Sequence, residues 1–273
     1  MLIAQISDLH IRPAGQLAYG VAETNVMAER AIHALLRLRP RPDVVIVTGD
    51  AADCGLAEEY AILIALIARL PCPAYVIPGN HDRREAMRAA FAPLGRFGAH
   101  GPLNFAVDVG PLRLVGLDSV VEGASHGELS GETLAFLEAE LNEHRDRPTI
   151  VCLHHPPFDC GIAHMDRIRL VTGCEDLARI VGAHPQVERI LAGHHHRSIQ
   201  ARFAGTICQI APSVGHAVAL DLSPDGAAAF VLEPPAFLLH QWDEGVGLVT
   251  HTAFVDRAPG PFPFLLPPEY PGG

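Results

Sequence analysis

Lysine is absent from this chain, so all 20 basic residues are arginines. Without lysine, a Schiff-base nucleophile and the lysine of a phosphate-binding P-loop are both excluded. No two of the six cysteines are spaced as CxxC, so neither a zinc ribbon nor a thioredoxin-type redox motif is indicated. Cys152 and Cys208 fall in apolar runs, where we expect them to pack as small buried thiols.

Segments that would direct the chain to a membrane are also missing. The residues that follow Met1 show neither the basic region nor the small-residue cleavage site of a signal peptide. No apolar run approaches the ~18 uninterrupted residues of a membrane-spanning helix. We therefore expect a cytoplasmic protein with no membrane partner.

The chain also lacks an excess of basic residues, since its formal net charge is −11. A general nucleic-acid binder normally carries a basic face, so we expect no general nucleic-acid binding. A phosphate-containing substrate remains compatible with this charge, because bound metal ions would dominate the local field. With 273 residues, of which 49% are hydrophobic, the chain is long enough for one large domain or a domain with an appendage.

The first part of the chain alternates between predicted strands and helices. Strands are predicted at 2–7, 43–48 and 74–77, and helices at 23–38 and 57–70. This order indicates parallel strands with right-handed crossovers.

The pattern then changes to a predicted hairpin, 103–109 and 112–118, joined by Gly110-Pro111. A helix follows with Ser130 as its N-cap. Alternation resumes with a strand at 149–153, a helix near 175–182 and a strand at 187–192. From residue 201 onward the chain is mostly β, with strands predicted at 201–203, 206–210, 217–222, 227–232, 237–241 and 248–255. Two stacked sheets with helices outside would account for both halves.

Metal-binding side chains follow five of the apolar runs directly. The five segments are Asp8-Leu9-His10, Gly49-Asp50, Gly79-Asn80-His81-Asp82, His154-His155-Pro156 and Gly193-His194-His195-His196. Strand ends in an open α/β sheet are where ligands bind. Five ends that carry carboxylate, carboxamide and imidazole groups therefore predict one site with two metal ions.

The first segments offer oxygen and nitrogen ligands. Asp8 and His10 point the same way in an extended backbone, so both can bind one ion, although the pair also fits an N-cap aspartate and a surface histidine. Asp50 has two oxygens that can bridge ions about 3.5–4 Å apart, although Gly-Asp after a strand is also a common loop. Asn80 offers a neutral carbonyl oxygen.

His81 is adjacent to Asn80 and is predicted to point elsewhere. There it could contact substrate or protonate a leaving oxygen. Asp82 could orient His81 by accepting a hydrogen bond from it. A second aspartate, Asp118, could be a further ligand or could cap a loop, and we leave it outside the metal set.

The histidine pair and the histidine triplet have directional constraints. Consecutive residues at a strand end point opposite ways, so one of His154 and His155 should face the metals while the other supports the site or packs. Alternation lets His194 and His196 face one side while His195 turns away. Tyr19 and His216 are weaker candidates for contact with a substrate.

The five metal-binding segments, taken in their order along the chain, resemble the motifs of the calcineurin-like metallophosphoesterases, which include the purple acid phosphatases. The resemblance covers about residues 1–215, and the segments Ala18-Tyr19-Gly20 and His154-His155-Pro156-Pro157 are most similar to bacterial glycerophosphodiesterases and class III cyclic-nucleotide phosphodiesterases. It implies a four-layer αββα sandwich, in which two mixed sheets lie between helices. The tyrosine ligand of the purple acid phosphatases has no counterpart in the loop after Asp50.

Three regions follow from the resemblance and from where it fades. Residues 1–215 would be the metallophosphoesterase catalytic domain. Residues 216–257 would be a β-rich extension that completes the sheet or forms a cap or dimer arm, and 258–273 a proline-rich tail. The β-rich arm favours a homodimer or a higher homo-oligomer.

The resemblance also implies which residues hold the two ions. One ion would be bound by Asp8, His10, Asp50 and His196, and the other by Asp50, Asn80, His154 and His194. His81 would be the catalytic residue, and the candidate substrate contacts are Asn80, His81 and His195. This mixture of imidazole, carboxylate and carboxamide suits Fe²⁺, Mn²⁺, Zn²⁺ or Co²⁺ and disfavours Ca²⁺.

We therefore expect metal-dependent hydrolysis of small phosphodiesters, either 3′,5′-cyclic nucleotides or glycerophosphodiesters, with a metal-bound hydroxide as the nucleophile. A phosphomonoesterase, a nuclease or a non-catalytic metal-binding scaffold could use the same residues. A structural zinc site is disfavoured, because such sites are usually four-coordinate and often hold their metal through cysteine.

Overall fold

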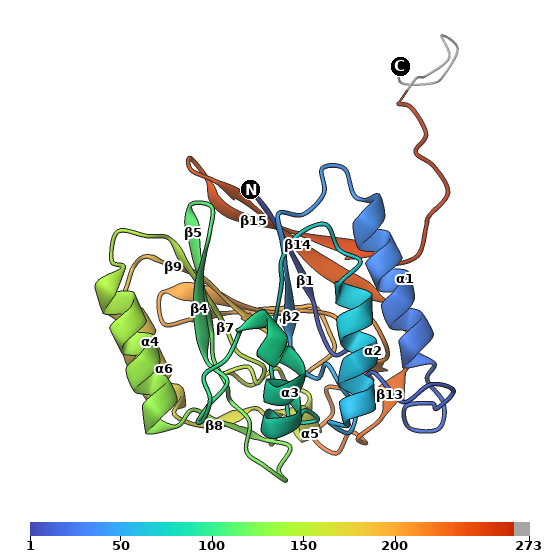
Figure 1. Ribbon diagram of the computed structural model, residues 1–273, viewed down its shortest axis with the longest axis horizontal. Coiled ribbons are helices and arrows are strands. Elements are labelled where there is room, and N and C mark those ends of the chain that lie inside the picture. The colour runs from blue at the N-terminus through green and yellow to red at the C-terminus, as the bar shows by residue number, and fades with distance from the viewer. Residues whose placement is uncertain (265–273) are drawn as a thin grey trace.

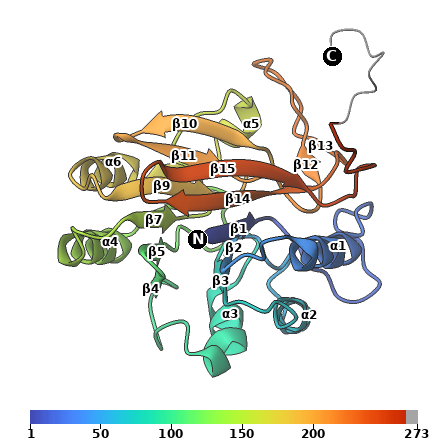
Figure 2. The same cartoon turned by 90° about the horizontal axis from the view of Figure 1, so that it is seen from above.

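Two mixed β-sheets form the centre of the molecule, and helices cover both outer faces (Figures 1 and 2). The computed structural model describes residues 1–264, so the part of the predicted tail beyond residue 264 lies outside the described residues. The first sheet has the order β15-β14-β1-β2-β3, with its strands at Gly247–Phe254, Ala236–Asp243, Leu2–Ile6, Val44–Thr48 and Ala74–Ile77. Strands β1, β2 and β3 are parallel, as predicted, and β14 adds to β1 in the antiparallel direction.

The second sheet has the order β10-β11-β9-β7-β5-β4. Its strands are Ile199–Phe203, Thr206–Ile210, Val187–Ala192, Thr149–Cys152, Leu112–Gly116 and Phe105–Val109. Strands β5, β7, β9 and β11 are parallel, and the two ends of the sheet are closed by antiparallel hairpins. The predicted hairpin through Gly110-Pro111 is confirmed, since Val109 is paired with Leu112.

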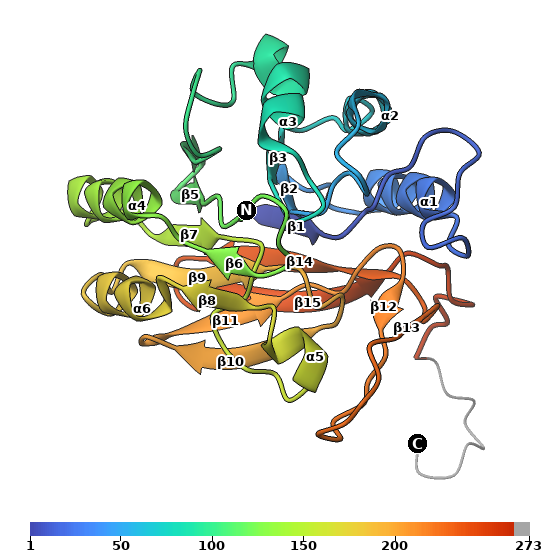
Figure 3. The ribbon, with the colours of Figure 1, turned by 90° about the horizontal axis from the view of Figure 1, so that it is seen from below.

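Two small strand pairs and a short helix lie at the end of the molecule shown in Figure 3. They are β6 (Gly127–Glu128) with β8 (Leu170–Thr172), β12 (Ala217–Val218) with β13 (Phe230–Val231), and α5 (Ala163–Asp166). The longer strands predicted at 217–222 and 227–232 are wrong beyond these two-residue pieces. Between them, Pro224 and Gly226 favour turns, and the Asp221 carboxylate accepts a hydrogen bond from the backbone of Ser223 at 2.9 Å.

Helices α1 (Thr24–Arg37), α2 (Ala57–Ile67) and α3 (Arg84–Phe91) pack on the first sheet, and α4 (Gly131–Glu143) and α6 (Cys174–Gly182) pack on the second. Ser130 caps α4 as predicted, because its hydroxyl accepts from the Thr133 backbone at 3.1 Å. Helix α3, which continues into the 3₁₀ turn η1 (Ala92–Leu94), was not predicted, although Met87 and Phe91 bury one face at helical spacing. Among residues 1–264, no helix has the length and hydropathy required to cross a membrane.

Alternation along the central strands produces three apolar layers. In β1, Ile3 packs between the two sheets, whereas Ala4 and Ile6 pack under the helices of the first sheet. A separate apolar cluster lies between the second sheet and its helices. Three cores between four layers confirm the predicted αββα sandwich.

A buried polar network joins the two sheets close to the ends of their parallel strands. The Gln5 amide donates to the Thr48 hydroxyl at 3.0 Å and to the Ala192 carbonyl of the other sheet at 2.9 Å. The Gln5 carbonyl oxygen lies 3.0 Å from His240 Nε2, and His240 Nδ1 lies 2.9 Å from the Thr250 hydroxyl. A neutral His240 satisfies both contacts, by donating to Gln5 and accepting from Thr250.

This network predicts an acid-sensitive contribution to stability. Burial, with a smaller effect from the charge of Arg189, lowers the pKa of His240 to about 3, whereas an unfolded histidine titrates near pH ~6.5. Between these two pKa values, His240 binds a proton in the unfolded chain but not in the folded chain. The free energy of unfolding therefore decreases as the pH falls below ~6.5. We expect wild type to lose about 2 kcal/mol more than His240→Gln between about pH 7.5 and about pH 5.

Urea unfolding in the presence of a chelator measures this difference, because the other histidines contribute equally to both proteins. His251→Gln, at an exposed position on β15, is the matched control and should follow wild type. Parallel pH profiles of wild type and His240→Gln would contradict the assignment.

Candidate metal centre

The five predicted segments meet at the carboxyl ends of the parallel strands. The ladder between β1 and β2 continues into their loops, where the Asp8 N–H donates to the Gly49 carbonyl at 3.1 Å and the His10 N–H to the Asp50 carbonyl at 2.9 Å. A cavity of about 430 Å³ opens beside them. Its lining includes His10, Asp50, Asn80, His81, His194 and His196.

The backbone at this edge is in an unusual conformation. Among residues 1–264, seven non-glycine residues have left-handed φ values, and five of them lie at these strand ends: Asp8 at 55°, His10 at 46°, Asp50 at 46°, His194 at 70° and His196 at 54°. Side chains with a Cβ rarely adopt this region, and such outliers cluster at functional sites. All five are among the predicted metal ligands, so the strain coincides with the predicted chemistry.

Close approach of the two sheets requires a glycine before Asp50. Gly49 has φ of 93°, and a Cβ there would lie 2.2 Å from His154 Nδ1. Any other side chain would therefore separate the ends of β2 and β7, which carry Asp50 and His154.

Each of the four predicted ligand histidines uses one ring nitrogen for a hydrogen bond directed away from the centre. The contacts are His10 Nδ1 with Asp53 Oδ1 at 3.0 Å, His154 Nδ1 with the Thr48 carbonyl at 2.8 Å, His194 Nε2 with the Ile168 carbonyl at 3.0 Å, and His196 Nδ1 with the His216 carbonyl at 2.9 Å. All four partners are acceptors, so the proton of each neutral imidazole is held at that nitrogen. The other nitrogen is left with a lone pair, as in metal-binding histidines.

Two of these lone pairs face each other. His10 Nε2 lies 3.3 Å from His196 Nε2, and His196 Nε2 lies 3.3 Å from Asp8 Oδ1. Donor atoms of Asp8, His10, Asp50 and His196 all lie within 4.8 Å of one another. Two imidazole lone pairs at hydrogen-bond distance repel unless a cation lies between them, so this group fits a metal ion.

A second group of unpaired donor atoms lies beside the first. Asp50 Oδ2 is 3.3 Å from His154 Nε2 and 3.7 Å from His10 Nε2, so the carboxylate lies between the two groups. His154 Nε2, Asn80 Oδ1 and Asp8 Oδ2 are buried without a hydrogen-bond partner. Buried polar atoms are normally paired, and a cation would pair these.

The charges at the centre favour the binding of a cation. Burial alone would raise the pKa of Asp50, but the charges of His154, His81 and His10 outweigh it and hold that pKa well below its usual range. Burial opposes protonation of His154, yet the charges of Asp50 and Asp8 raise its pKa to about 9. The same position would attract a metal ion.

His81 lines the cavity, with 27% of its side chain exposed. Its Nδ1 lies 2.7 Å from the Asp53 carbonyl, and its Nε2 makes no hydrogen bond to another residue among residues 1–264. The expectation that Asp82 orients His81 is wrong. The Asp82 carboxylate instead accepts from the backbones of Gly79, Ala51 and Ala52 and from the Tyr60 hydroxyl, because it is buried below the loops.

Asp53 is the residue that the sequence analysis missed. Its carboxylate accepts from His10, its carbonyl holds His81, and Arg12 pairs with it at 3.1 Å. The only sequence signal was a second carboxylate three positions after Asp50. Asp118 lies apart from the centre and pairs with Arg84 at 2.6 Å.

The remaining histidines of the motifs differ in position. His155 is buried, with Nδ1 2.8 Å from the Ser119 hydroxyl and its ring 4.6 Å from that of His194. His195 is fully buried and is not among the residues that line the cavity, so the geometry gives no support to its predicted substrate contact. Tyr19 and His216 do line the cavity.

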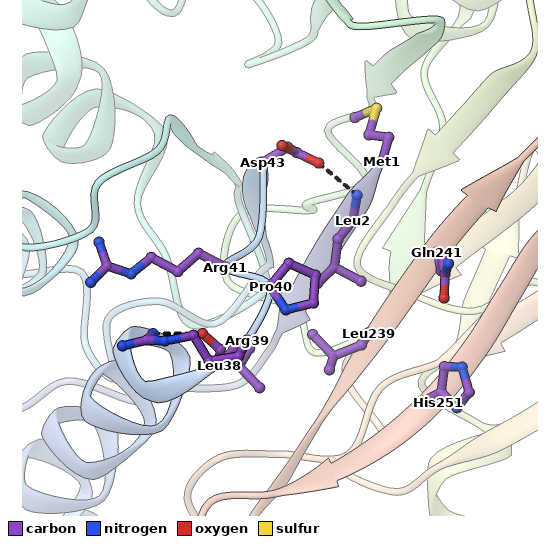
Figure 4. Close-up of a pocket in the computed structure, with 10 residues that line it drawn as sticks. All are labelled: Met1, Leu2, Leu38, Arg39, Pro40, Arg41, Asp43, Leu239, Gln241 and His251. Atoms are coloured by element: carbon purple, nitrogen blue, oxygen red, sulfur yellow. Dashed lines mark hydrogen bonds between the residues drawn. The ribbon is translucent and has the colours of Figure 1, made fainter.

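A cavity of similar size, about 450 Å³, lies at the opposite end of β1 (Figure 4). Met1, Leu2, Pro40, Leu239 and His251 are among its lining residues, and Arg39 and Arg41 flank it. It contains none of the predicted ligands. The chemistry suggested by the motifs therefore belongs to the cavity at the carboxyl ends of the strands.

Residues 1–198 match the profile of the family described as "Calcineurin-like phosphoesterase". A probable glycerophosphodiester phosphodiesterase GpdQ from Arcobacter nitrofigilis is 40% identical over 264 residues, which cover 97% of each chain. A probable cyclic nucleotide phosphodiesterase from Rhodopseudomonas palustris is 34% identical over 243 residues, 87% of this chain and 86% of that one.

Solved structures share the fold at low sequence identity. A dimetal phosphatase from Danio rerio aligns with a TM-score of 0.62 at 15% identity, over 94% of this chain and 99% of that one. A purple acid phosphatase from yellow lupin aligns with a TM-score of 0.65 at 16% identity, over 93% of this chain and 51% of that one. These likenesses concern the fold alone.

The centre predicts that removal of Asp50 weakens two cation sites together. We expect chelator-treated wild type to bind two equivalents of Mn²⁺ in a calorimetric titration, and to gain about 2.7 kcal/mol of stability per site when the free ion reaches 100 times its Kd. Asp50→Ala should lose most of this gain, because its carboxylate lies between both groups.

Asp176→Ala, which removes an exposed carboxylate on α6, is the control and should bind like wild type. Two equivalents bound by Asp50→Ala with unchanged affinity would show that Asp50 is not shared.

Proposed function

The chain belongs to the calcineurin-like phosphoesterase family, and on that premise we propose that it hydrolyses small phosphodiesters at two divalent metal ions. The observation that carries the proposal is the convergence of unpaired donor atoms from five strand ends. Asp8, His10, Asp50 and His196 would hold one ion. Asp50, Asn80, His154 and His194 would hold the other.

The donor set fits Fe²⁺, Mn²⁺, Zn²⁺ or Co²⁺, because imidazole nitrogen is combined with carboxylate and carboxamide oxygen. When bound, such ions supply a hydroxide near neutral pH and neutralise charge on phosphoryl oxygens. The protein fixes the tautomer of each histidine through the outward hydrogen bonds, so the donor atoms need no rearrangement.

In this proposal, His81 would act on the leaving group. The Asp53 carbonyl can only accept, so Nδ1 carries a proton, and Nε2 is the nitrogen available to the cavity. In the protonated imidazole, Nε2–H would donate to the phosphoryl oxygen or to the departing alkoxide. The T-shaped packing of its ring on His10, at 4.6 Å between centroids, keeps it beside the centre.

The lining of the cavity favours a diester over a monoester. In the part of the chain that the structure describes, no arginine lines the cavity, and the chain has no lysine. A monoester dianion would therefore find no permanently cationic side chain, whereas a diester carries a single negative charge. Met165, Ile168, Val218 and Phe230 form an apolar side of the cavity that the second ester group of a diester would contact.

Glycerophosphodiesters are the substrate class that we propose first, and 3′,5′-cyclic nucleotides are the second. The support is the relative from Arcobacter nitrofigilis, whose 40% identity extends over 97% of this chain, including the segments that build the apolar side of the cavity. A cytoplasmic location and a homo-oligomeric assembly stay predictions.

Hydrolysis of matched model substrates tests the proposal. With Mn²⁺ added, bis(p-nitrophenyl) phosphate should be cleaved with a higher kcat/KM than p-nitrophenyl phosphate, because only the diester has a second ester group that can contact the apolar side while the first is cleaved. A second panel of glycerophosphodiesters, cyclic AMP and cyclic GMP then ranks the natural classes.

Faster cleavage of the monoester would identify a phosphomonoesterase. Two bound metal equivalents without turnover of any diester would identify a non-catalytic scaffold. Either result would overturn the proposal.

His81→Ala should lower kcat by about 10²–10⁴-fold, the range expected when a general acid is lost, while two metal equivalents remain bound. The effect should be smaller for p-nitrophenyl esters than for alkyl esters, because a good leaving group needs less protonation. His100→Ala, an exposed histidine, is the control. If His81→Ala lost bound metal together with activity, His81 would instead be a metal ligand.

A further inference from the structure

Three side chains of metal-binding types meet outside the cavity. Cys160 sulfur, an Asp166 carboxylate oxygen and a His195 ring nitrogen all lie within 4.8 Å of one another. His195 follows β9, whereas Cys160 and Asp166 belong to the segment around α5. None of the three is needed for the two ions proposed above, so the cluster requires its own explanation.

His195 is the part of the cluster that lacks a partner. Its side chain is completely buried, and neither Nδ1 nor Nε2 has a hydrogen-bond partner among residues 1–264. Leaving one buried polar group unpaired costs about 1–3 kcal/mol. In folded proteins such groups are paired by an ordered water or an ion.

Asp166 is held firmly in place beside it. One carboxylate oxygen accepts from the Cys160 N–H at 2.7 Å and the other from the Gly161 N–H at 3.1 Å, and each keeps a further lone pair. Buried Ile162, Met165 and Val218 form an apolar group against which Cys160 packs, whereas Cys160 and Asp166 are partly exposed, so an ion can reach the cluster from solvent.

The Cys160 thiol holds its proton more tightly than a free cysteine does. Burial and the neighbouring Asp166 carboxylate raise its pKa to about 11, which keeps it protonated near neutral pH. A cation bound by the sulfur would displace that proton.

We propose that Cys160, Asp166 and His195 form a third cation site, for a thiophilic divalent ion such as Zn²⁺ or Co²⁺. Thiolate, imidazole and carboxylate are the ligands of such ions, at about 2.3 Å for sulfur and about 2.0–2.2 Å for nitrogen and oxygen. In a tetrahedral site two such ligand atoms are about 3.3–3.6 Å apart. Atoms that lie within 4.8 Å of one another would have to approach by about 1 Å, which side-chain rotation can supply. Mg²⁺ and Ca²⁺ do not fit, because they prefer oxygen.

Occupancy of this site would also order the cavity. Met165 and Ile168, on either side of Asp166 in sequence, line the cavity. His195 lies between two proposed ligands, His194 and His196. An ion that joins Asp166 to His195 would therefore fix the apolar side of the cavity relative to the metal centre.

Cobalt binding tests the site through a signal that the binuclear centre cannot give. A thiolate bound to Co²⁺ produces a near-ultraviolet charge-transfer absorption, and no cysteine is among the ligands of that centre. We expect chelator-treated, reduced protein to bind three equivalents of Co²⁺, with this absorption. Cys160→Ser should lose the absorption and one equivalent, and Asp166→Asn should weaken that one equivalent.

Cys54→Ser is the matched control, because Cys54 is the exposed cysteine at which cobalt would bind adventitiously. It should keep the absorption. Asp50→Ala should also keep it while losing the ions of the binuclear centre, so this inference and the proposed function can fail separately.

An absent charge-transfer absorption in wild type at saturating Co²⁺ would overturn the proposal and leave a buried water as the partner of His195. Retention of the absorption in Cys160→Ser, or its loss in Cys54→Ser, would overturn it as well. Two equivalents still bound by Cys160→Ser would show that this variant is folded.

Discussion

The site depends on three strand ends, those of β1, β2 and β9, where the backbone is held in the left-handed region. Each such residue with a Cβ costs about 1–2 kcal/mol, so Asp8, His10, Asp50, His194 and His196 together consume a large part of an ordinary stability of about 5–15 kcal/mol. The ladder between β1 and β2 continues into the loops and holds Asp8, His10 and Asp50, and the His194 N–H donates to the Asp8 carboxylate at 3.1 Å. The two-sheet core must therefore be rigid before the donor atoms can converge, and the αββα sandwich supplies that rigidity through three apolar layers.

A second cost arises from the donor atoms themselves. His10 and His196 direct lone pairs at each other, and His154 Nε2 and Asn80 Oδ1 have no hydrogen-bond partner among the described residues. Without a cation these atoms destabilise the folded chain; with one, the same atoms stabilise it. The outward hydrogen bonds to carbonyls and to Asp53 act in both states, because they fix each imidazole before any ion arrives. Folding and cation binding are therefore coupled at this edge of the sheets.

Sequence pattern was sufficient for the strand ends, because apolar runs followed at once by polar residues mark where buried strands emerge. It was also sufficient for the start of α4, because the N-cap Ser130 bonds to a residue only three positions along the chain. It did not reveal Asp53, because its role depends on the loop after β2 folding back under His10 and His81. It also overextended the strands after Ala217, since β-propensity describes a half-buried surface and this ribbon has little to pack against. Local signals predicted what local geometry determines, and tertiary contacts decided the rest.

Selectivity and catalysis are built on different parts of the fold. The proposed ligands extend from the two sheets, where movement is restricted, whereas the apolar side of the cavity comes from α5 and from the β12–β13 ribbon, which are short and irregular. Such segments tolerate substitution better than strand ends, so substrate preference can change while the centre is retained. The triplet His194–His195–His196 connects the two parts. Its outer members are proposed ligands, and its middle member lies within 4.8 Å of Asp166 at the end of α5. His194 Nε2 also lies 3.0 Å from the carbonyl of Ile168, just after α5, so a displacement of this segment would reach a proposed ligand. The apolar side is therefore not independent of the metal centre, even though no residue of α5 belongs to the ligand set.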